Sequence, residues 1–281
     1  MKGRKFNYLE WTIDIYVIGM SLKKKSRINI GIFINMAKND FQSRYASSFL
    51  GVVWAYVQPL INLLVMWYVF QVGLRSSNVK DVPFIVWFAP ASLVWSFFAD
   101  SLSSTTMCMK EYNYLVCKVN FDIKMIPVIK IMSSCLVHIV FIFFLYFLNS
   151  IYKVPFSLYS IQVWYYFICL IVYLVGIGMI VSVVTPFLPD LQSIINVVLQ
   201  IGFWATPIVW NIDAMSPMVQ KLCKLNPVYY IVTGYRDSLI DHIWFWERKG
   251  TTLYFWGLTL LILVGGYRLF KKMKKHLADV L

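Results

Sequence analysis

Amide and indole side chains recur at four-residue steps in two apolar parts of the sequence. In chain order they are Trp54, Gln58 and Asn62, then Gln192, Asn196, Gln200 and Trp204. Residues four apart lie on one face of an α-helix, so each set would form a polar and aromatic lane. Amides hydrogen-bond hydroxyl groups, and an aromatic face stacks on a sugar ring while still letting it slide. The two lanes therefore favour a substrate conduit for a hydroxyl-rich polymer.

The same amides have a second interpretation. Polar side chains within a membrane commonly hydrogen-bond neighbouring helices to one another, and these residues could do only that. A single lane could also arise by chance. Two lanes with matching spacing favour the conduit over the structural interpretation.

The composition indicates that these lanes lie in a membrane. Of the 281 residues, 59% are hydrophobic and only 14% are charged. A soluble domain normally carries about 25% charged residues, and the apolar excess cannot be buried in one globular core. The fold class is therefore predicted as an all-α polytopic membrane protein, with a single transmembrane domain over residues 1–281.

The basic residues predict the orientation of the chain. The formal net charge is +13, and lysine and arginine cluster before residue 49 and after residue 267. Because the side of the membrane richer in these residues is cytoplasmic, both termini are expected in the cytoplasm, which requires an even number of spans. Juxtamembrane basic clusters pair with anionic lipid headgroups, so this charge does not indicate nucleic-acid binding.

Runs of about 20 mainly apolar residues can span a bilayer. Six transmembrane helices are expected, at residues 49–73, 83–106, 126–150, 161–185, 191–209 and 251–270. Residues 1–28 are expected as a cytoplasmic N-terminal segment, and 29–47 have the periodicity of an amphipathic helix lying in the membrane interface. Ser47, Ser48 and Gly51 predict a bend between that helix and the first span.

Three connections have distinctive sequences. Residues 107–125 carry lysines and are predicted to form a cytoplasmic loop, and the prolines in 186–190 (PFLPD) predict a tight turn. Residues 210–250 are expected outside the cytoplasm but are too apolar for an ordinary loop. Pro217 and Pro227 divide them into pieces too short to span, so two short re-entrant helices are expected between spans five and six.

Several motifs, taken together and in order, resemble one family of membrane proteins. They are DFQSRYASSFLGVVWAYVQP, LVWSFFADSL, NYLVCKVNF, PDLQSIINVVLQIGFWATPIVW, KLNPVYYIVTGYRDSLI and FKKMKKHLADVL. The chain is similar to the permease subunits of type-two ABC exporters, which move lipid-linked polysaccharides such as O-antigen, capsule or teichoic acid out of bacteria. One departure is that this family commonly has Phe-Pro where Asn120, Phe121 and Asp122 stand here.

The resemblance implies a homodimer in the bacterial inner (plasma) membrane, in contact with membrane lipids and a lipid-linked glycan. It also implies two copies of a separate nucleotide-binding ATPase subunit, docked on the interfacial helix and on the coupling loop 107–125. Lys110, Glu111 and Tyr112 are the docking candidates, unless that loop is merely solvated. Since the chain has no GxxxxGK[ST] phosphate loop, ATP and magnesium are expected on the partner, with no catalytic residue, metal or cofactor here.

Lys38 and Arg44 lie where a lipid-linked pyrophosphate would arrive from the inner leaflet. Arginine suits phosphate because its guanidinium presents a fork of donors. Contact with ordinary anionic lipids explains the same two residues equally well.

Other polar residues have two interpretations each. Asp100 is a polar lining or gating group, or, as favoured here, part of a helix end near the cytoplasmic face. Arg236 and Asp237 are expected to stabilise the re-entrant region through an ion pair, the alternative being contact with the emerging glycan. His138 stands alone in an apolar span and is expected to be packed and neutral.

These features favour ATP-driven export of a lipid-linked polysaccharide. One alternative is export of small hydrophobic drugs, against which the amide lanes stand. A membrane-embedded glycosyltransferase would need clustered acids or a metal site, and the chain has no DxD pair. Amides and aromatic faces suit many sugars, so these residues single out neither O-antigen, capsule nor teichoic acid.

Overall fold

The apolar runs of the sequence form long helices in the computed structural model, which describes residues 30–74, 82–118 and 122–281. The expected N-terminal segment 1–28 and parts of two expected loops, 75–81 and 119–121, lie outside the described residues. The chain divides into two units, Met1–Met36 and Ala37–Leu281. All packing described below belongs to the second unit.

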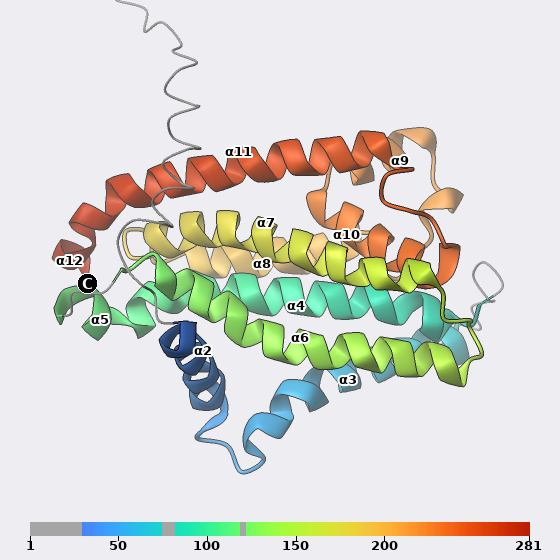
Figure 1. Ribbon diagram of the computed structural model, residues 1–281, viewed down its shortest axis with the longest axis horizontal. Helices are drawn as coiled ribbons and strands as arrows, with labels where there is room; N and C mark the ends of the chain where they lie inside the picture. The colour runs from blue at the N-terminus through green and yellow to red at the C-terminus, as the bar shows by residue number, and fades with distance from the viewer. Residues whose placement is uncertain (1–29, 75–81, 119–121) are drawn as a thin grey trace, which may run out of the picture. The chain divides into compact units, whose positions relative to one another are not determined.

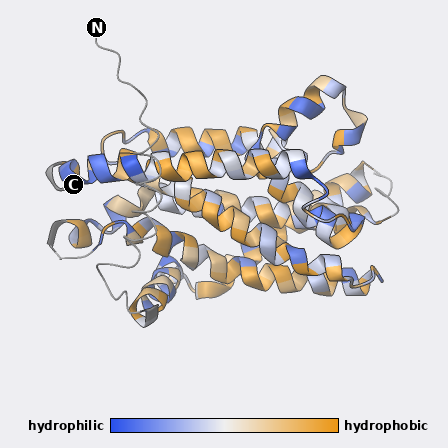
Figure 2. Ribbon diagram, turned by 45° about the horizontal axis from the view of Figure 1, so that its top comes forward, coloured by the Kyte–Doolittle hydropathy of each residue, from blue (hydrophilic) through white to orange (hydrophobic). Residues whose placement is uncertain are grey.

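Every regular element within the described ranges is helical, which confirms the all-α prediction. In chain order the elements are α2 (Ile30–Tyr45), η1 (Gly51–Val53), α3 (Trp54–Trp67), η2 (Tyr68–Gly73), α4 (Phe84–Glu111), α5 (Asn113–Lys118), α6 (Met125–Ile151), η3 (Leu158–Ile161), α7 (Gln162–Val184), α8 (Leu191–Ala205), η4 (Ile212–Ala214), α9 (Pro217–Lys224), α10 (Pro227–Arg236), η5 (Asp237–Asp241), α11 (Lys249–Met273), η6 (Lys274–His276) and α12 (Leu277–Val280). Apolar residues cover the long helices, and hydrophilic residues gather toward helix ends (Figure 2).

Five helices of the described chain are long and apolar enough to cross a membrane. They are Gly51–Gly73, Phe84–Glu111, Met125–Ile151, Leu158–Val184 and Lys249–His276. The remaining expected span, 191–209, is the 15-residue helix α8, about 22 Å long against a hydrocarbon core of about 30 Å. It ends at Ala205 because Thr206 precedes a proline and adopts an extended backbone. The count of six spans therefore stays a prediction.

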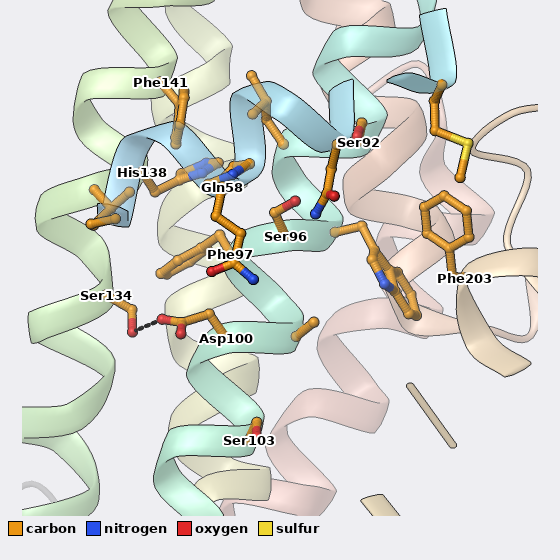
Figure 3. A pocket seen from close by; sticks show the side chains of 18 of the residues that line it. Gln58, Ser92, Ser96, Phe97, Asp100, Ser103, Ser134, His138, Phe141 and Phe203 are labelled. Atoms are coloured by element: carbon orange, nitrogen blue, oxygen red, sulfur yellow. Dashed lines mark hydrogen bonds between the residues drawn. The ribbon is translucent and has the colours of Figure 1, made fainter. Parts of the chain in front are cut away.

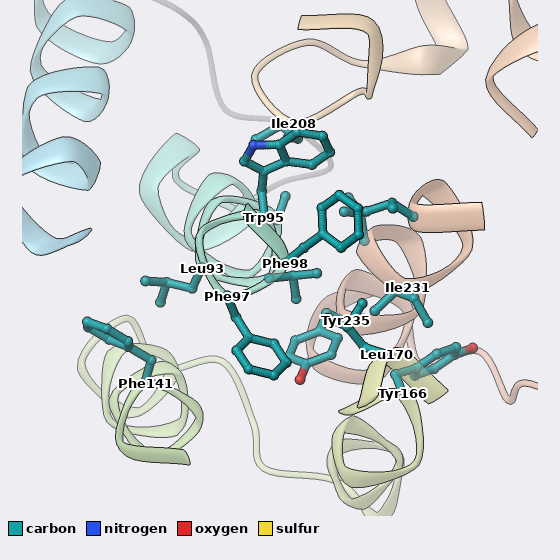
Figure 4. Close-up of a cluster of buried hydrophobic side chains, with 14 of the residues drawn as sticks. Leu93, Trp95, Phe97, Phe98, Phe141, Tyr166, Leu170, Ile208, Ile231 and Tyr235 are labelled. Atoms are coloured by element: carbon teal, nitrogen blue, oxygen red, sulfur yellow. The ribbon is translucent and has the colours of Figure 1, made fainter. Parts of the chain in front are cut away.

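Helix α4 forms the centre of the second unit. It packs against α3, α6, α7, α8 and α10 (Figure 1), and most of its side chains are buried. Phe97 and Phe98 of α4 meet Leu170 of α7 and Tyr235 of α10 in the hydrophobic core (Figure 4). By contrast, α3 and α11 expose large apolar side chains such as Leu64. An apolar face of this kind needs lipid or another protein against it.

Glycines determine two local features of this packing. A Cβ atom on Gly266 of α11 would lie 2.6 Å from the carbonyl oxygen of Gly176 in α7, so only glycine permits this close approach. Gly51 has a φ of +53°, which glycine adopts without steric cost. It follows the turn at residues 46–50, where the small residues predict a bend.

Prolines mark the connections as expected. Between α7 and α8, the amides of Phe187 and Leu188 both donate to the carbonyl of Val184, which forms the predicted tight turn. Helices α9 and α10 begin at Pro217 and Pro227, where a missing N–H costs nothing. These are the two short helices that the sequence predicts; their re-entrant placement in the membrane stays a prediction.

Candidate functional site

A cavity of about 870 Å³ opens among α3, α4, α6 and α8 (Figure 3). Its polar lining residues come from all four helices: Gln58, Asn62, Ser92, Ser96, Asp100, Ser103, Ser134, His138 and Gln200. Aromatic residues share the lining, namely Tyr45, Trp95, Phe97, Phe141 and Phe203. Polar groups at membrane depth are costly and usually face a pathway or a protein interior. This cavity is therefore the candidate functional site.

Some residues of the two amide lanes lie together in this cavity. Gln58 and Asn62 reach it from α3 and Gln200 reaches it from α8, although the two helices are more than a hundred residues apart in sequence. Within the described chain, these three side chains make no hydrogen bond to another residue. Their amides are thus available to a ligand, as the conduit interpretation requires.

Other members of the lanes have different surroundings. Gln192 donates to the hydroxyl of Ser103 at 2.9 Å and to Asn196 Oδ1 at 3.2 Å, so it connects α8 to α4. That contact fits the structural interpretation of the amides. Trp54 and Trp204 are 41% and 53% exposed and are not among the described lining residues. The cavity therefore draws its aromatic surface from residues other than the two lane tryptophans.

A row of polar side chains on α4, which belongs to neither lane, also lines the cavity. Ser92, Ser96, Asp100 and Ser103 follow one another at three- and four-residue steps and all line the cavity. This spacing places them on one helix face, so the signal was present in the sequence. Asp100 lies in the middle of α4, which continues to Glu111. The interpretation of Asp100 as part of a helix end is therefore wrong.

Arg44 of α2 connects this carboxylate to its surroundings. Its Nε donates to Asp40 Oδ2 at 3.0 Å, and its Nη1 donates to Asp100 Oδ2 at 3.3 Å. Nη1 also donates to the Ser134 hydroxyl at 3.2 Å, and Nη2 donates to the carbonyl of Lys130 at 3.2 Å. Ser134 in turn donates to Asp100 at 2.5 Å. One guanidinium thus joins α2, α4 and α6.

Lys130 of α6 completes this group. Its Nζ lies 2.6 Å from Asp40 Oδ1 and 2.5 Å from Glu111 Oε2, and its side chain is only 4% exposed. The Tyr112 hydroxyl donates to Asp40 Oδ1 at 2.8 Å. Burial by itself raises the pKa of Asp40, but Arg44 and Lys130 outweigh it and hold that pKa below its usual value. Burial and the bond to Asp40 raise the pKa of Tyr112.

We call these seven residues the ion network: Asp40, Arg44, Asp100, Glu111, Tyr112, Lys130 and Ser134. Three of them, Arg44, Glu111 and Tyr112, were expected to face a pyrophosphate or an ATPase. The structure gives them partners inside the protein instead, while Lys38 is exposed and Lys110 is half-buried. Contact with pyrophosphate or an ATPase stays a prediction for all five.

Arg236 and Asp237 have different neighbours from those expected. The Arg236 guanidinium donates to three backbone carbonyls, those of Trp87, Pro207 and Ile208, at 2.7–3.1 Å. It also lies 3.5 Å from the centre of the Trp87 ring. Asp237 accepts two hydrogen bonds from Arg248. Consecutive helical side chains point about 100° apart, so the two residues face different parts of the protein.

His138 lies between the core and the cavity. Its Nε2 is 2.9 Å from the Tyr235 hydroxyl, and its ring stacks on Phe97 with centroids 4.6 Å apart. With 1% exposure it is packed as expected. No group of three His, Cys, Asp or Glu side chains suited to a metal ion occurs among the described residues.

Comparison with known proteins gives consistent matches over most of the chain. A family model described as ABC-2 type transporter matches residues 32–240. An O-antigen export system permease protein RfbA from Klebsiella pneumoniae is 23% identical over 274 residues, which cover 93% of this chain and 100% of that protein. A protein of the same name from Myxococcus xanthus is 22% identical over 220 residues, covering 75% of this chain and 81% of its own.

Proposed function

Since the chain belongs to the ABC-2 type transporter family, we propose that it is the membrane-spanning subunit of an ATP-driven exporter of a lipid-linked polysaccharide. Its relatives are named O-antigen export permeases, and a glycan of that kind, or of the capsule or teichoic-acid kind, is the proposed cargo. The observation that carries the proposal is the polar cavity among membrane-spanning helices.

The chemistry of the cavity suits a sugar chain. Gln58, Asn62 and Gln200 present amides without a partner in the described chain, and each amide both donates and accepts hydrogen bonds. Trp95 and Phe203 add aromatic faces to the same lining. A small hydrophobic drug offers these amides no hydrogen-bonding groups. A glycan satisfies them with hydroxyl groups.

The proposal includes the partners that an exporter of this kind needs. Two copies of this chain would form the channel in the inner membrane with both termini in the cytoplasm, and two copies of a separate ATPase would bind there. The ion network supports a route for coupling, because it joins α2 to the cavity-lining carboxylate of Asp100. A displacement of α2 by the ATPase would thereby reach the conduit.

Substitution of the lane amides tests the conduit. The variant carries Gln58→Leu, Asn62→Leu, Asn196→Leu and Gln200→Leu, and it is expressed in a strain that lacks the chromosomal gene. We expect loss of surface glycan, measured by immunoblot, with normal membrane insertion and normal co-purification of the ATPase. Apolar side chains keep the helices in the membrane but cannot bind hydroxyl groups.

The matched control is Gln220→Leu, which removes a half-buried amide of α9 that donates to the carbonyl of Met215 and is not among the described lining residues of the cavity. We expect this variant to export normally. Normal export by the fourfold variant would show that the lane amides do not form the conduit.

A further inference from the structure

The charge of the cavity restricts what can pass through it. Asp100 is the only Asp, Glu, Lys or Arg side chain in the lining that the structure describes. Its side chain is 52% exposed. The other polar lining groups are amides, hydroxyls and one imidazole. A ligand in this cavity therefore meets hydrogen-bonding groups and a negative charge.

The cations nearest to the cavity already form ion pairs with carboxylates of this chain. Lys130 is 4% exposed and lies between Asp40 and Glu111. Arg44 is 17% exposed and is shared by Asp40 and Asp100. The two cations thus face three carboxylates, which leaves one negative charge on the ion network. Neither cation is free to neutralise an anionic cargo.

The long helices at and beside the cavity would not supply the missing cation in a second copy of the chain. The helices α3, α7 and α8 contain no Asp, Glu, Lys or Arg. In α4 and α6 the only such residues are Asp100, Lys110, Glu111 and Lys130. Lys110 lies in the last turn of α4, away from the cavity lining. Adding another copy of these helices therefore adds no free cation along the conduit.

Electrostatics makes this arrangement unfavourable for a polyanion. Pores for anions and phosphate are lined by arginine or lysine, and a charge taken from water into a low-dielectric site needs a partner. A polymer with an acid group in every repeat would meet that cost again at each step of its passage. The phosphates that link a glycan to its lipid occur once, at one end of the chain.

We propose that this exporter carries a glycan whose repeat unit has no net negative charge, and that it does not carry polymers rich in carboxylate, phosphate or sulfate. Of the cargoes named above, this narrows the choice to neutral O-antigen or capsule glycans and excludes the phosphate-rich teichoic acids. This assignment rests on the proposed function and adds the chemical class of the cargo. The amide and hydroxyl lining binds neutral sugar hydroxyls, whereas an acid group would meet Asp100 and no free cation among the described lining residues.

Gene deletion followed by chemical analysis of the retained glycan tests this proposal. Lipid-linked glycan is extracted from the deletion strain, released from its carrier by mild acid, and applied to an anion-exchange column at neutral pH. Uronic acid, phosphate and sulfate are assayed per repeat unit. The gene supplied on a plasmid is the control and should restore surface glycan. We expect a retained glycan that passes through the column unbound and lacks acid groups.

Two other outcomes would overturn the assignment in different ways. A glycan that accumulates in the cell, binds the column and contains acid groups in its repeat refutes the charge selectivity but leaves polysaccharide export intact. Unchanged surface glycan with no accumulation inside the cell refutes export itself, and the charge selectivity with it.

Discussion

Arg44 and Arg236 are both largely buried arginines, but their partners differ in kind. Arg236 donates to three backbone carbonyls and lies against the Trp87 ring. Arg44 donates mainly to side chains, among them the half-exposed Asp100. A backbone carbonyl changes position only when its helix or loop does, whereas a side chain can change rotamer. Arg236 therefore fixes α10 on the bundle, and Arg44 forms contacts that can be exchanged.

The surroundings of the two arginines agree with this difference. The carbonyls of Pro207 and Ile208 belong to the segment after α8, and that of Trp87 belongs to α4. Arg236 thus holds three parts of the chain together away from the cavity lining. Arg44 instead contacts Asp100 and Ser134, which both line the cavity. One arginine serves the fold, and the other lies next to the proposed conduit.

Arg236→Met should have the largest effect on stability. The substitution keeps most of the side-chain length but leaves three buried carbonyls without their donor, and each such loss costs about 1–3 kcal/mol. We expect a strong decrease in the detergent-soluble, folded protein and in its thermal midpoint. Lys224→Met, on the exposed surface of α9, is the control. A wild-type thermal midpoint for Arg236→Met would contradict the role of Arg236 in stabilising the fold.

Asp40→Asn should have an intermediate effect that depends on pH. Asp40 accepts from Arg44, Lys130 and Tyr112, and loss of its charge should cost about 2–3 kcal/mol at neutral pH. Its folded pKa lies below the ordinary value, so its contribution is complete above the unfolded pKa and disappears as the pH falls through the folded pKa. Thermal midpoints of the two proteins should therefore converge in acid. A constant difference at all pH values would contradict this.

Asp100→Asn should have the smallest effect on stability and a clear effect on transport. The contact of Asp100 with Arg44 is half-exposed, so its coupling energy should be below about 1 kcal/mol in a double-mutant cycle with Arg44→Gln. We expect the single variant to fold normally and to export less glycan, because the link between α2 and the cavity is weakened. Unchanged export would show that Arg44 serves only the fold, as Arg236 does.

Much of the fold could be predicted from the sequence, because the patterns that indicate helices and turns involve residues close together in the chain. Apolar runs predict the long helices, PFLPD predicts the turn between α7 and α8, and Pro217 and Pro227 mark the starts of α9 and α10. The shared face of Gln58 and Asn62 follows from a spacing of four residues. The shortness of α8 could have been read from Pro207, which ends the helix earlier than the apolar run does.

The sequence by itself determined that this is an apolar, helical chain with polar faces on α3, α4 and α8, since composition and periodicity depend on neighbouring residues only. Tertiary structure decided that Gln58, Asn62 and Gln200 share one cavity while Gln192 bonds to Ser103. It also decided that Arg44 reaches Asp100 and that Arg248 reaches Asp237. Such pairings depend on which helices pack together, and residues distant in sequence carry no local signal of that choice.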